Sequence, residues 1–155
     1  MRVWRVWSSA VTAARAAAVF LKPSSPVMAP SARSRAHHKP DVFVVPREIA
    51  RAAIIEESPG LIPGTELYLT AEVISPGSGS ERTDRLRKVS EYARLGIPQF
   101  WIVEHAPRLS VQVLTLADGT YTAAPVATEG ARLEAVIDAD KPFTVSFDPA
   151  DLLDF

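Results

Sequence analysis

The sequence predicts a mixed α/β (α+β) fold in which helices cover a β-sheet. Short apolar runs bounded by proline and glycine recur along the chain, as expected of strands. One segment between two such runs has helical periodicity, and Asp118-Gly119 between two alternating segments is typical of a β-hairpin turn. The order of strand, helix, strand and then several strands indicates a mixed sheet with helices packed on it.

Composition limits the classes of protein and site. With 155 residues, 47% of them hydrophobic, the chain is long enough for one compact domain with a substantial core. Because it has no cysteine, it cannot form disulfides, thiolate zinc sites or a cysteine nucleophile, and any metal must be bound by oxygen or histidine. The net charge of -1 argues against a strongly basic nucleic-acid binder, although a local basic patch remains open.

Residues 1–38 differ from the rest of the chain. Residues 11–21 are apolar and rich in alanine, and a Pro/Ser/Ala-rich stretch follows. Arg15 interrupts the apolar run and no small-residue cleavage site follows it, so we expect no secretory signal and a cytoplasmic location. The run is also too short to cross a bilayer, which takes about 20 residues. We expect residues 1–38 to be a low-complexity region, disordered or a short Ala-rich helix, and residues 39–155 to form the folded domain.

The strands are expected in the following order. Residues 42–45 are continuously apolar after Pro40, which is typical of a strand buried on both faces. Residues 47–55 have moderate helical spacing, and residues 67–75 form the next strand. Further strands are expected at residues 99–104, 109–116, 120–122, 133–137 and 143–147.

Glu72 is an acid inside an apolar strand. Its burial costs on the order of several kcal/mol unless the carboxylate is paired, protonated or bound to a metal. A glutamate at the rim, facing water or an arginine, is the structural alternative. Together with Asp41 and a lysine further along the chain, however, Glu72 supplies the groups that metal-dependent phosphodiester cleavage uses.

A helix is expected at residues 81–95, ended by Gly96 and Pro98. Its predicted buried stripe consists of Leu86, Val89 and Ala93, with Tyr92 at the edge. The spacing of four residues places Asp84, Lys88 and Tyr92 on one face beside this stripe. A surface ion pair between Asp84 and Lys88 explains the same spacing, so spacing alone does not decide between the two roles.

Several motifs in a fixed order resemble the Uma-two family of restriction-endonuclease-like proteins, which is abundant in bacteria and belongs to the PD-(D/E)XK nuclease superfamily. The resemblance covers about residues 39–153 and implies a restriction-endonuclease-like mixed sheet flanked by helices. The motifs are Pro40-Asp41, Ala71-Glu72-Val73-Ile74-Ser75-Pro76-Gly77-Ser78, then Asp84, Lys88, Tyr92 and Ala93, and finally Gly96-Ile97-Pro98-Gln99-Phe100-Trp101.

The resemblance implies a role for each of these residues. Asp41 and Glu72, with the backbone carbonyl of Ile74, would coordinate Mg²⁺ or Mn²⁺, which prefer oxygen ligands. The superfamily's lysine usually stands two residues after the second acid, where this chain has Ile74. Lys88 on the following helix would take over its role. The residues with implied supporting roles are Asp84, Arg85 and Tyr92, of which Arg85 is the reserve candidate for the role of Lys88.

The implied activity is that of a divalent-metal-dependent endonuclease hydrolysing phosphodiester bonds in DNA, with nucleic acid rather than a membrane as its partner. Family members carry a Tyr-Glu-Leu-like segment before the Pro-Asp motif, and none occurs before Lys39. We therefore expect an N-terminally incomplete copy of the fold whose exposed apolar surface favours a homodimer. The alternative is a catalytically inactive remnant of the nuclease fold or an interaction module.

Overall fold

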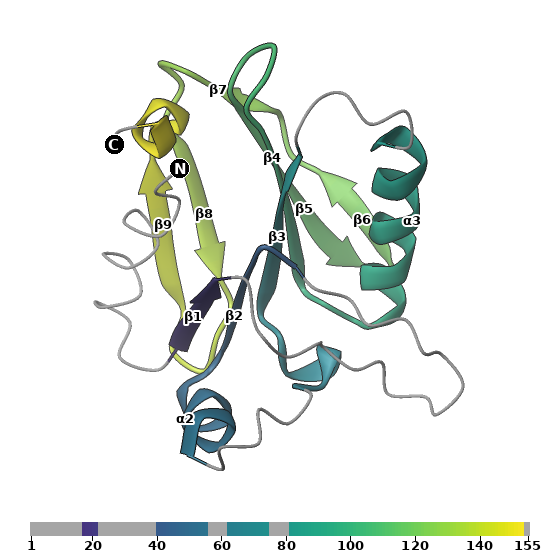
Figure 1. Cartoon of the computed structure of the whole chain (residues 1–155), viewed down its shortest axis with the longest axis vertical. Helices are drawn as coiled ribbons and strands as arrows, with labels where there is room; N and C mark the ends of the chain where they lie inside the picture. Colours follow the sequence, from purple (N-terminus) through teal and green to yellow (C-terminus); the bar gives the residue numbers. More distant parts are fainter. Residues whose placement is uncertain (1–16, 22–39, 56–61, 75–80, 154–155) are drawn as a thin grey trace.

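The computed structural model describes residues 17–21, 40–55, 62–74 and 81–153, and Figure 1 shows a large twisted sheet with a smaller sheet on one side and α3 on the other. The fold is thus mixed α+β, as predicted. The helical elements are α2 (Arg47–Ile55), η1 (Gly64–Glu66), α3 (Glu81–Arg94) and η2 (Pro149–Leu153). The strands are β1 (Ala17–Leu21), β2 (Val42–Pro46), β3 (Leu69–Ile74), β4 (Gln99–Glu104), β5 (Ser110–Ala117), β6 (Thr120–Ala123), β7 (Ala127–Thr128), β8 (Leu133–Ile137) and β9 (Phe143–Phe147).

The larger sheet has the order β1-β2-β3-β4-β5-β6, with β7 also pairing with β5, and β8 and β9 form the smaller sheet. Among the described strands, β3 and β4 are the parallel pair, and α3 connects them. Parallel strands need such a crossover, and ligands of open α/β sheets commonly bind beyond the carboxyl ends of the parallel strands. The fold therefore directs attention to the ends of β3 and β4.

The large sheet is buried on both faces, which explains its continuous apolar runs. On the α3 face, the core includes Phe43, Tyr92 and Phe100, and the rings of Tyr92 and Phe100 meet edge to face with centroids 5.0 Å apart. On the opposite face, Trp101 stacks on Phe147 of β9 with centroids 6.3 Å apart. Alternate residues of β2 and β4 thus supply two separate cores.

Residues 17–21 form β1, so the expected Ala-rich helix or disorder is wrong for this part of the N-terminal segment. β1 pairs antiparallel with β2 in a register that places Ala17 opposite Pro46. Backbone pairing with an otherwise open sheet edge outweighs the helix propensity of alanine. The rest of residues 1–38 lies outside the described residues, so the domain boundary at residue 38 stays a prediction.

The buried stripe of α3 is rotated relative to the prediction. Leu86 is 64% exposed, whereas Tyr92 is 1% exposed and therefore lies at the centre of the buried face rather than at its edge. The spacing of Arg85, Lys88, Val89 and Tyr92 is that of one helix face. This face of α3 meets acidic side chains of the sheet, and it therefore carries Arg85 and Lys88 where an apolar stripe was expected.

Of the helices that the structure describes, none is long and apolar enough to span a membrane.

The hairpin between β5 and β6 turns at Asp118-Gly119, as predicted. Both residues have positive φ, 50° and 76°, as a type I′ turn requires. We expect Gly119→Ala to lower the free energy of unfolding by about 1–2 kcal/mol, because an L side chain is strained in this conformation. Asp118→Asn is the control and should change it by less than about 0.5 kcal/mol. Urea denaturation measures both, and equal effects of the two changes would contradict this account of the turn.

Candidate active site

The register of β2 and β3 places Asp41 beside Glu72. Val42 pairs with Ala71 and Phe43 with Thr70, so one further step puts Asp41, immediately before β2, opposite Glu72. Residues directly opposite each other in a sheet project from the same face. Asp41 shares the face of Phe43 in the next pleat, which is the face covered by α3. The two acids therefore lie on the same face, as the predicted site requires.

Asp41 is tethered to β3 by its own carboxylate. Its Oδ2 accepts a hydrogen bond from the backbone N–H of Val73 at 2.9 Å. The carboxylate thus serves as the acceptor that a strand N–H otherwise finds in a backbone carbonyl, just before the first residue of β2. This bond holds the carboxylate against the strand that carries Glu72.

Helix α3 contacts both oxygens of Glu72. Tyr92 Oη donates a hydrogen bond to Oε1 at 2.6 Å, and Lys88 Nζ lies 2.8 Å from Oε2. The carboxylate is nearly buried, with 7% of its side chain exposed, whereas 32% of the Lys88 side chain is exposed. Lys88 thus reaches from solvent to a buried acid, and the catalytic role that the resemblance implies for it stays a prediction.

Burial raises the pKa of Glu72 above its ordinary value. The hydrogen bonds from Lys88 and Tyr92 and the charge of Lys88 oppose this rise, whereas the charge of Asp41 adds to it. Burial also raises the pKa of Tyr92, and the neighbouring charge of Glu72 raises it further. Burial is thus the main reason why the ionised form of Glu72 is disfavoured, and a cation near Asp41 and Glu72 would favour that form.

The backbone carbonyl of Ile74 points away from Asp41. It lies 3.0 Å from Nδ1 of His105, beyond the end of β4. The N–H and C=O of a strand residue point to the same neighbouring strand. Since the N–H of Val73 bonds to Asp41, the carbonyl of Val73 points to the same side of β3, toward Asp41. The role assigned to Ile74 stays a prediction, and Val73 has the carbonyl that is better oriented for a cation between Asp41 and Glu72.

A second polar cluster lies next to this site on the same face. Arg85 Nη1 forms an ion pair with Glu104 Oε1, and Arg85 Nη2 donates to Gln112 Oε1 at 3.0 Å. The hydroxyl of Ser110 donates to the other oxygen of Glu104 at 3.4 Å. Arg85, predicted as a supporting residue, is thus engaged by β4 and β5 rather than by Glu72.

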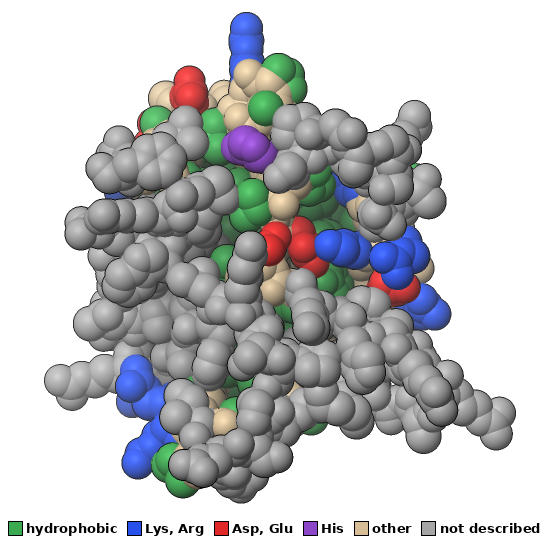
Figure 2. Space-filling model, in the orientation of Figure 1, with side chains coloured by type: hydrophobic (Ala, Val, Ile, Leu, Met, Phe, Trp, Pro, Cys, Tyr) green, Lys and Arg blue, Asp and Glu red, His purple; other side chains and the backbone are tan. Residues whose placement is uncertain are grey.

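The structure brings together Asp41, Glu72, Lys88 and Tyr92, whereas the side chain of Asp84 lies outside the described part of the chain. Figure 2 shows acidic side chains beside Lys and Arg side chains near the centre of one face of the molecule. Within the described residues, no three His, Cys, Asp or Glu side chains form a group that could hold a metal ion. The donors present are two carboxylates and a carbonyl, and such oxygen ligands fit a hard ion that keeps several waters, as Mg²⁺ does.

Sequence reasoning missed Glu104, Gln112 and His105. Glu104 directly follows the apolar run 100–103, and an acid next to such a run is a signal comparable to that of Glu72, so it could have been found. Gln112 is a polar residue in an alternating strand and carries no comparable pattern. His105 contacts a backbone carbonyl, and a contact of this kind depends on which strands are neighbours.

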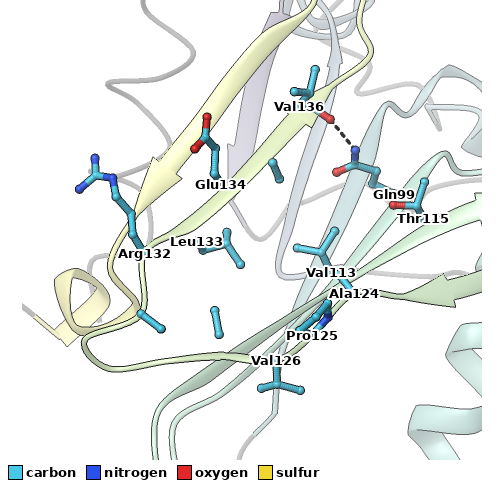
Figure 3. A pocket seen from close by; sticks show the side chains of 13 residues that line it. Gln99, Val113, Thr115, Ala124, Pro125, Val126, Arg132, Leu133, Glu134 and Val136 are labelled. Carbon is cyan, nitrogen blue, oxygen red and sulfur yellow. Dashed lines mark hydrogen bonds between the residues drawn. The ribbon is translucent and has the colours of Figure 1, made fainter.

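A cavity of about 530 Å³ lies on the opposite face of the large sheet, between β5 and β8 (Figure 3). Its walls are largely alanine and valine, and Gln99 Nε2 crosses it to donate to the carbonyl of Val136 at 2.6 Å. None of the candidate site residues lines this cavity. The polar chemistry of the α3 face is therefore separate from it.

Tyr92→Phe tests the hydrogen bond to the buried acid. Removing the hydroxyl takes away an interaction that lowers the pKa of Glu72, so we expect that pKa to rise further and the free energy of unfolding to fall by about 1–3 kcal/mol near neutral pH. A carboxyl with a raised folded-state pKa contributes most stability below its unfolded pKa, and that contribution is lost as the pH rises. Because the pKa of Glu72 is higher still in Tyr92→Phe, its contribution to stability should be lost over a pH range that extends to higher pH than in the wild-type protein.

Tyr121→Phe is the matched control, because Tyr121 Oη donates to the carbonyl of Ile97 at 2.7 Å and forms no hydrogen bond with an acid of the described residues. It should cost about 0.5–1.5 kcal/mol and leave the titration of Glu72 unchanged. Carboxyl ¹³C NMR reports the pKa of Glu72, and urea denaturation at several pH values reports stability. An unchanged pKa of Glu72 in Tyr92→Phe would show that the hydrogen bond does not influence its ionisation.

Comparisons with known proteins give a family model and a solved structure with a similar fold. Residues 2–141 match the family model Uma2, described as "Putative restriction endonuclease". This match starts well before Lys39, where the resemblance of the motifs begins. The structure is similar to a crystal structure described as "a putative nuclease belonging to DUF820" from Anabaena variabilis ATCC 29413, with a TM-score of 0.59 and 19% identity over 96% of this chain and 74% of that chain. No curated protein matches the sequence.

Proposed function

We propose a function for this chain from one premise, which is that it belongs to the Uma2 family. The proposal is a cytoplasmic, divalent-metal-dependent endonuclease that hydrolyses phosphodiester bonds in DNA. One observation carries it: the buried carboxylate of Glu72, beside Asp41, is contacted by a partly exposed lysine from the crossover helix. A purely structural ion pair would not need a second acid in the adjacent register position.

The donor atoms suit Mg²⁺ or Mn²⁺. Asp41, Glu72 and a strand carbonyl supply oxygen ligands, and Mg²⁺ typically binds to one or two carboxylates while retaining waters and substrate phosphate oxygens. When bound, such an ion polarises the phosphate and lowers the pKa of a coordinated water. The raised pKa of Glu72 supports this assignment, because a cation would favour the ionised form that burial disfavours.

The protein's own side chains would position the reacting groups. Tyr92 and Lys88 each contact one oxygen of Glu72, which holds the carboxylate in one orientation. The ammonium group of Lys88 carries three donor hydrogens, and 32% of the side chain is exposed, so the group could bond to Glu72 and also to a phosphate oxygen or an attacking water. Charge that develops on the phosphate would then be stabilised by a group already in place.

Plasmid nicking tests the activity. The full chain is incubated with supercoiled DNA in Mg²⁺, in Mn²⁺ and in EDTA, beside an Asp41→Ala variant. The proposal expects conversion to nicked or linear DNA with either metal, little in EDTA and little with the variant. Equal cleavage by both proteins would refute the assignment, because a contaminating nuclease would explain it. Single-stranded RNA in the same assay separates a DNA substrate from an RNA substrate, and sedimentation analysis tests the proposed homodimer.

A non-catalytic interaction module is the alternative, favoured by one observation. Both oxygens of Glu72 already have protein partners, which makes the acid self-sufficient in the absence of an ion. Calorimetric titration with Mn²⁺ discriminates between the two functions. The module predicts no heat of binding, whereas the enzyme predicts binding that weakens as the pH falls and Glu72 becomes protonated.

A further inference from the structure

Arg85 is held in place by the second polar cluster, and this cluster has no role in the function proposed above. The two terminal nitrogens of Arg85 pair with side chains of different strands. Nη1 forms an ion pair with Glu104 of β4, and Nη2 donates to Gln112 of β5 at 3.0 Å. Ser110 in turn donates to Glu104. The side chains of Arg85 and Glu104 are each 34% exposed, so this ion pair is only partly buried.

This guanidinium lies next to the candidate active site. Arg85 precedes Lys88 by three residues, a spacing that makes them neighbours on one face of α3. Across the sheet, Glu72 pairs with Ile102, and Ile102 pairs with Gln112. Gln112 is therefore two strands from Glu72 in the same row and on the same face, about 10 Å away at the usual strand spacing. Arg85 continues the line of side chains that begins at Asp41 and passes through Lys88.

The guanidinium has donors to spare. Arginine carries five N–H groups, and within the described part of the chain its hydrogen-bond acceptors are Glu104 and Gln112. The remaining N–H groups can meet the oxygens of a phosphate, whose geometry a planar guanidinium matches with two parallel bonds. Because side chains of two strands already hold Arg85 in one rotamer, binding of a ligand costs little further conformational entropy of this side chain.

We propose that Arg85 binds a backbone phosphate next to the one at Lys88, and that Glu104 and Gln112 are positioning residues that hold its guanidinium for this contact. The inference rests on the proposed function for the identity of its ligand, a phosphodiester chain. The charge of Glu104 offsets that of Arg85 and so reduces nonspecific attraction. The contact would thus fix which phosphate of the nucleic acid lies over Glu72.

The test measures binding of a fluorescent DNA duplex to the full chain in EDTA, where metal-dependent cleavage does not occur, over a range of salt concentrations. Arg85→Gln is expected to weaken binding by on the order of tenfold and to reduce the slope of log K against log salt by about 1. Arg85→Lys keeps the charge, so it should preserve the slope while losing affinity several-fold, since the planar fork is gone.

Arg132→Gln is the charge-matched control. Arg132, just before β8, is also a tethered arginine, with Nε donating to Ser146 Oγ at 2.8 Å, but it lines the cavity on the opposite face. Its loss should leave both affinity and slope nearly unchanged. If Arg85→Gln behaves like Arg132→Gln, or if the wild-type chain does not bind duplex under these conditions, the inference is overturned.

A double-mutant cycle tests the positioning role. Gln112→Leu changes no charge and should weaken binding several-fold in the wild-type background, yet add almost nothing in the Arg85→Gln background, because Gln112 acts through Arg85. Additive losses would instead indicate a structural role and overturn this part. Since none of these measurements needs cleavage, binding through Arg85 by a chain that does not nick plasmid would refute only the endonuclease. Nicking without an Arg85 effect would refute only this inference.

Discussion

Glu72→Gln is expected to abolish Mn²⁺ binding and to lower the rate of plasmid nicking by about a thousandfold. The amide keeps the shape of the carboxyl but is a poor ligand for a hard cation. A bound divalent ion stabilises the transition state by several kcal/mol, and each factor of ten in rate corresponds to about 1.36 kcal/mol. Calorimetry measures the binding, and initial rates of nicking measure the activity.

The loss should not come from unfolding. Burial already favours the uncharged form of Glu72, as its raised pKa indicates, and Lys88 is exposed enough to be hydrated when its partner is neutral. The thermal midpoint of Glu72→Gln is therefore expected to equal or exceed that of the wild-type protein at neutral pH. Glu134→Gln makes the same chemical change at an exposed position of β8 and should leave binding and rate unaltered. Retained Mn²⁺ binding in Glu72→Gln would remove this residue from the metal site.

Lys88→Met is expected to lower kcat by about 10²–10³-fold with little change in KM. In the proposed reaction the ammonium would stabilise charge that develops on the phosphate, so its contribution would be made mainly in the transition state. Metal binding should persist, because Lys88 contacts Glu72, the proposed ligand, and its ammonium group would not itself bind a cation. This combination of a lost rate and a retained metal distinguishes Lys88 from Glu72.

Two variants accompany Lys88→Met. Lys141→Met replaces an exposed lysine in the turn between β8 and β9 and should have no effect on kcat. Lys88→Arg keeps the charge but replaces a compact ammonium with a planar fork, so we expect only partial recovery of the rate. If Lys88→Met nicks DNA at the wild-type rate, Arg85 becomes the candidate for the catalytic cation.

Much of the fold was predictable because it depends on local patterns. Continuous apolar runs mark β2 and β4, and Asp118-Gly119 marks the hairpin after β5. β1 was not predictable, since its alanines favour a helix and only the edge of β2 makes a strand of them. The prediction of which face of α3 is buried was wrong for a similar reason, since that face depends on the sheet against which the helix packs. Apolar spacing selected Leu86, but the acids of the sheet draw Arg85 and Lys88 to the inner face.

The sequence by itself determined β2 to β6, β8, β9, α2 and α3, and it pointed to the family and to the acids and lysine of the candidate site, because residue types and their spacing carry this information. Only the tertiary structure decided which groups meet. The register of β2 on β3 brings Asp41 beside Glu72, and the crossover of α3 seats Tyr92 and Lys88 on the same carboxylate. Strand pairing also turns the carbonyl of Ile74 toward His105 and places Gln112 within reach of Arg85. These contacts join residues far apart in the chain, and local spacing cannot specify them because they depend on which strands become neighbours.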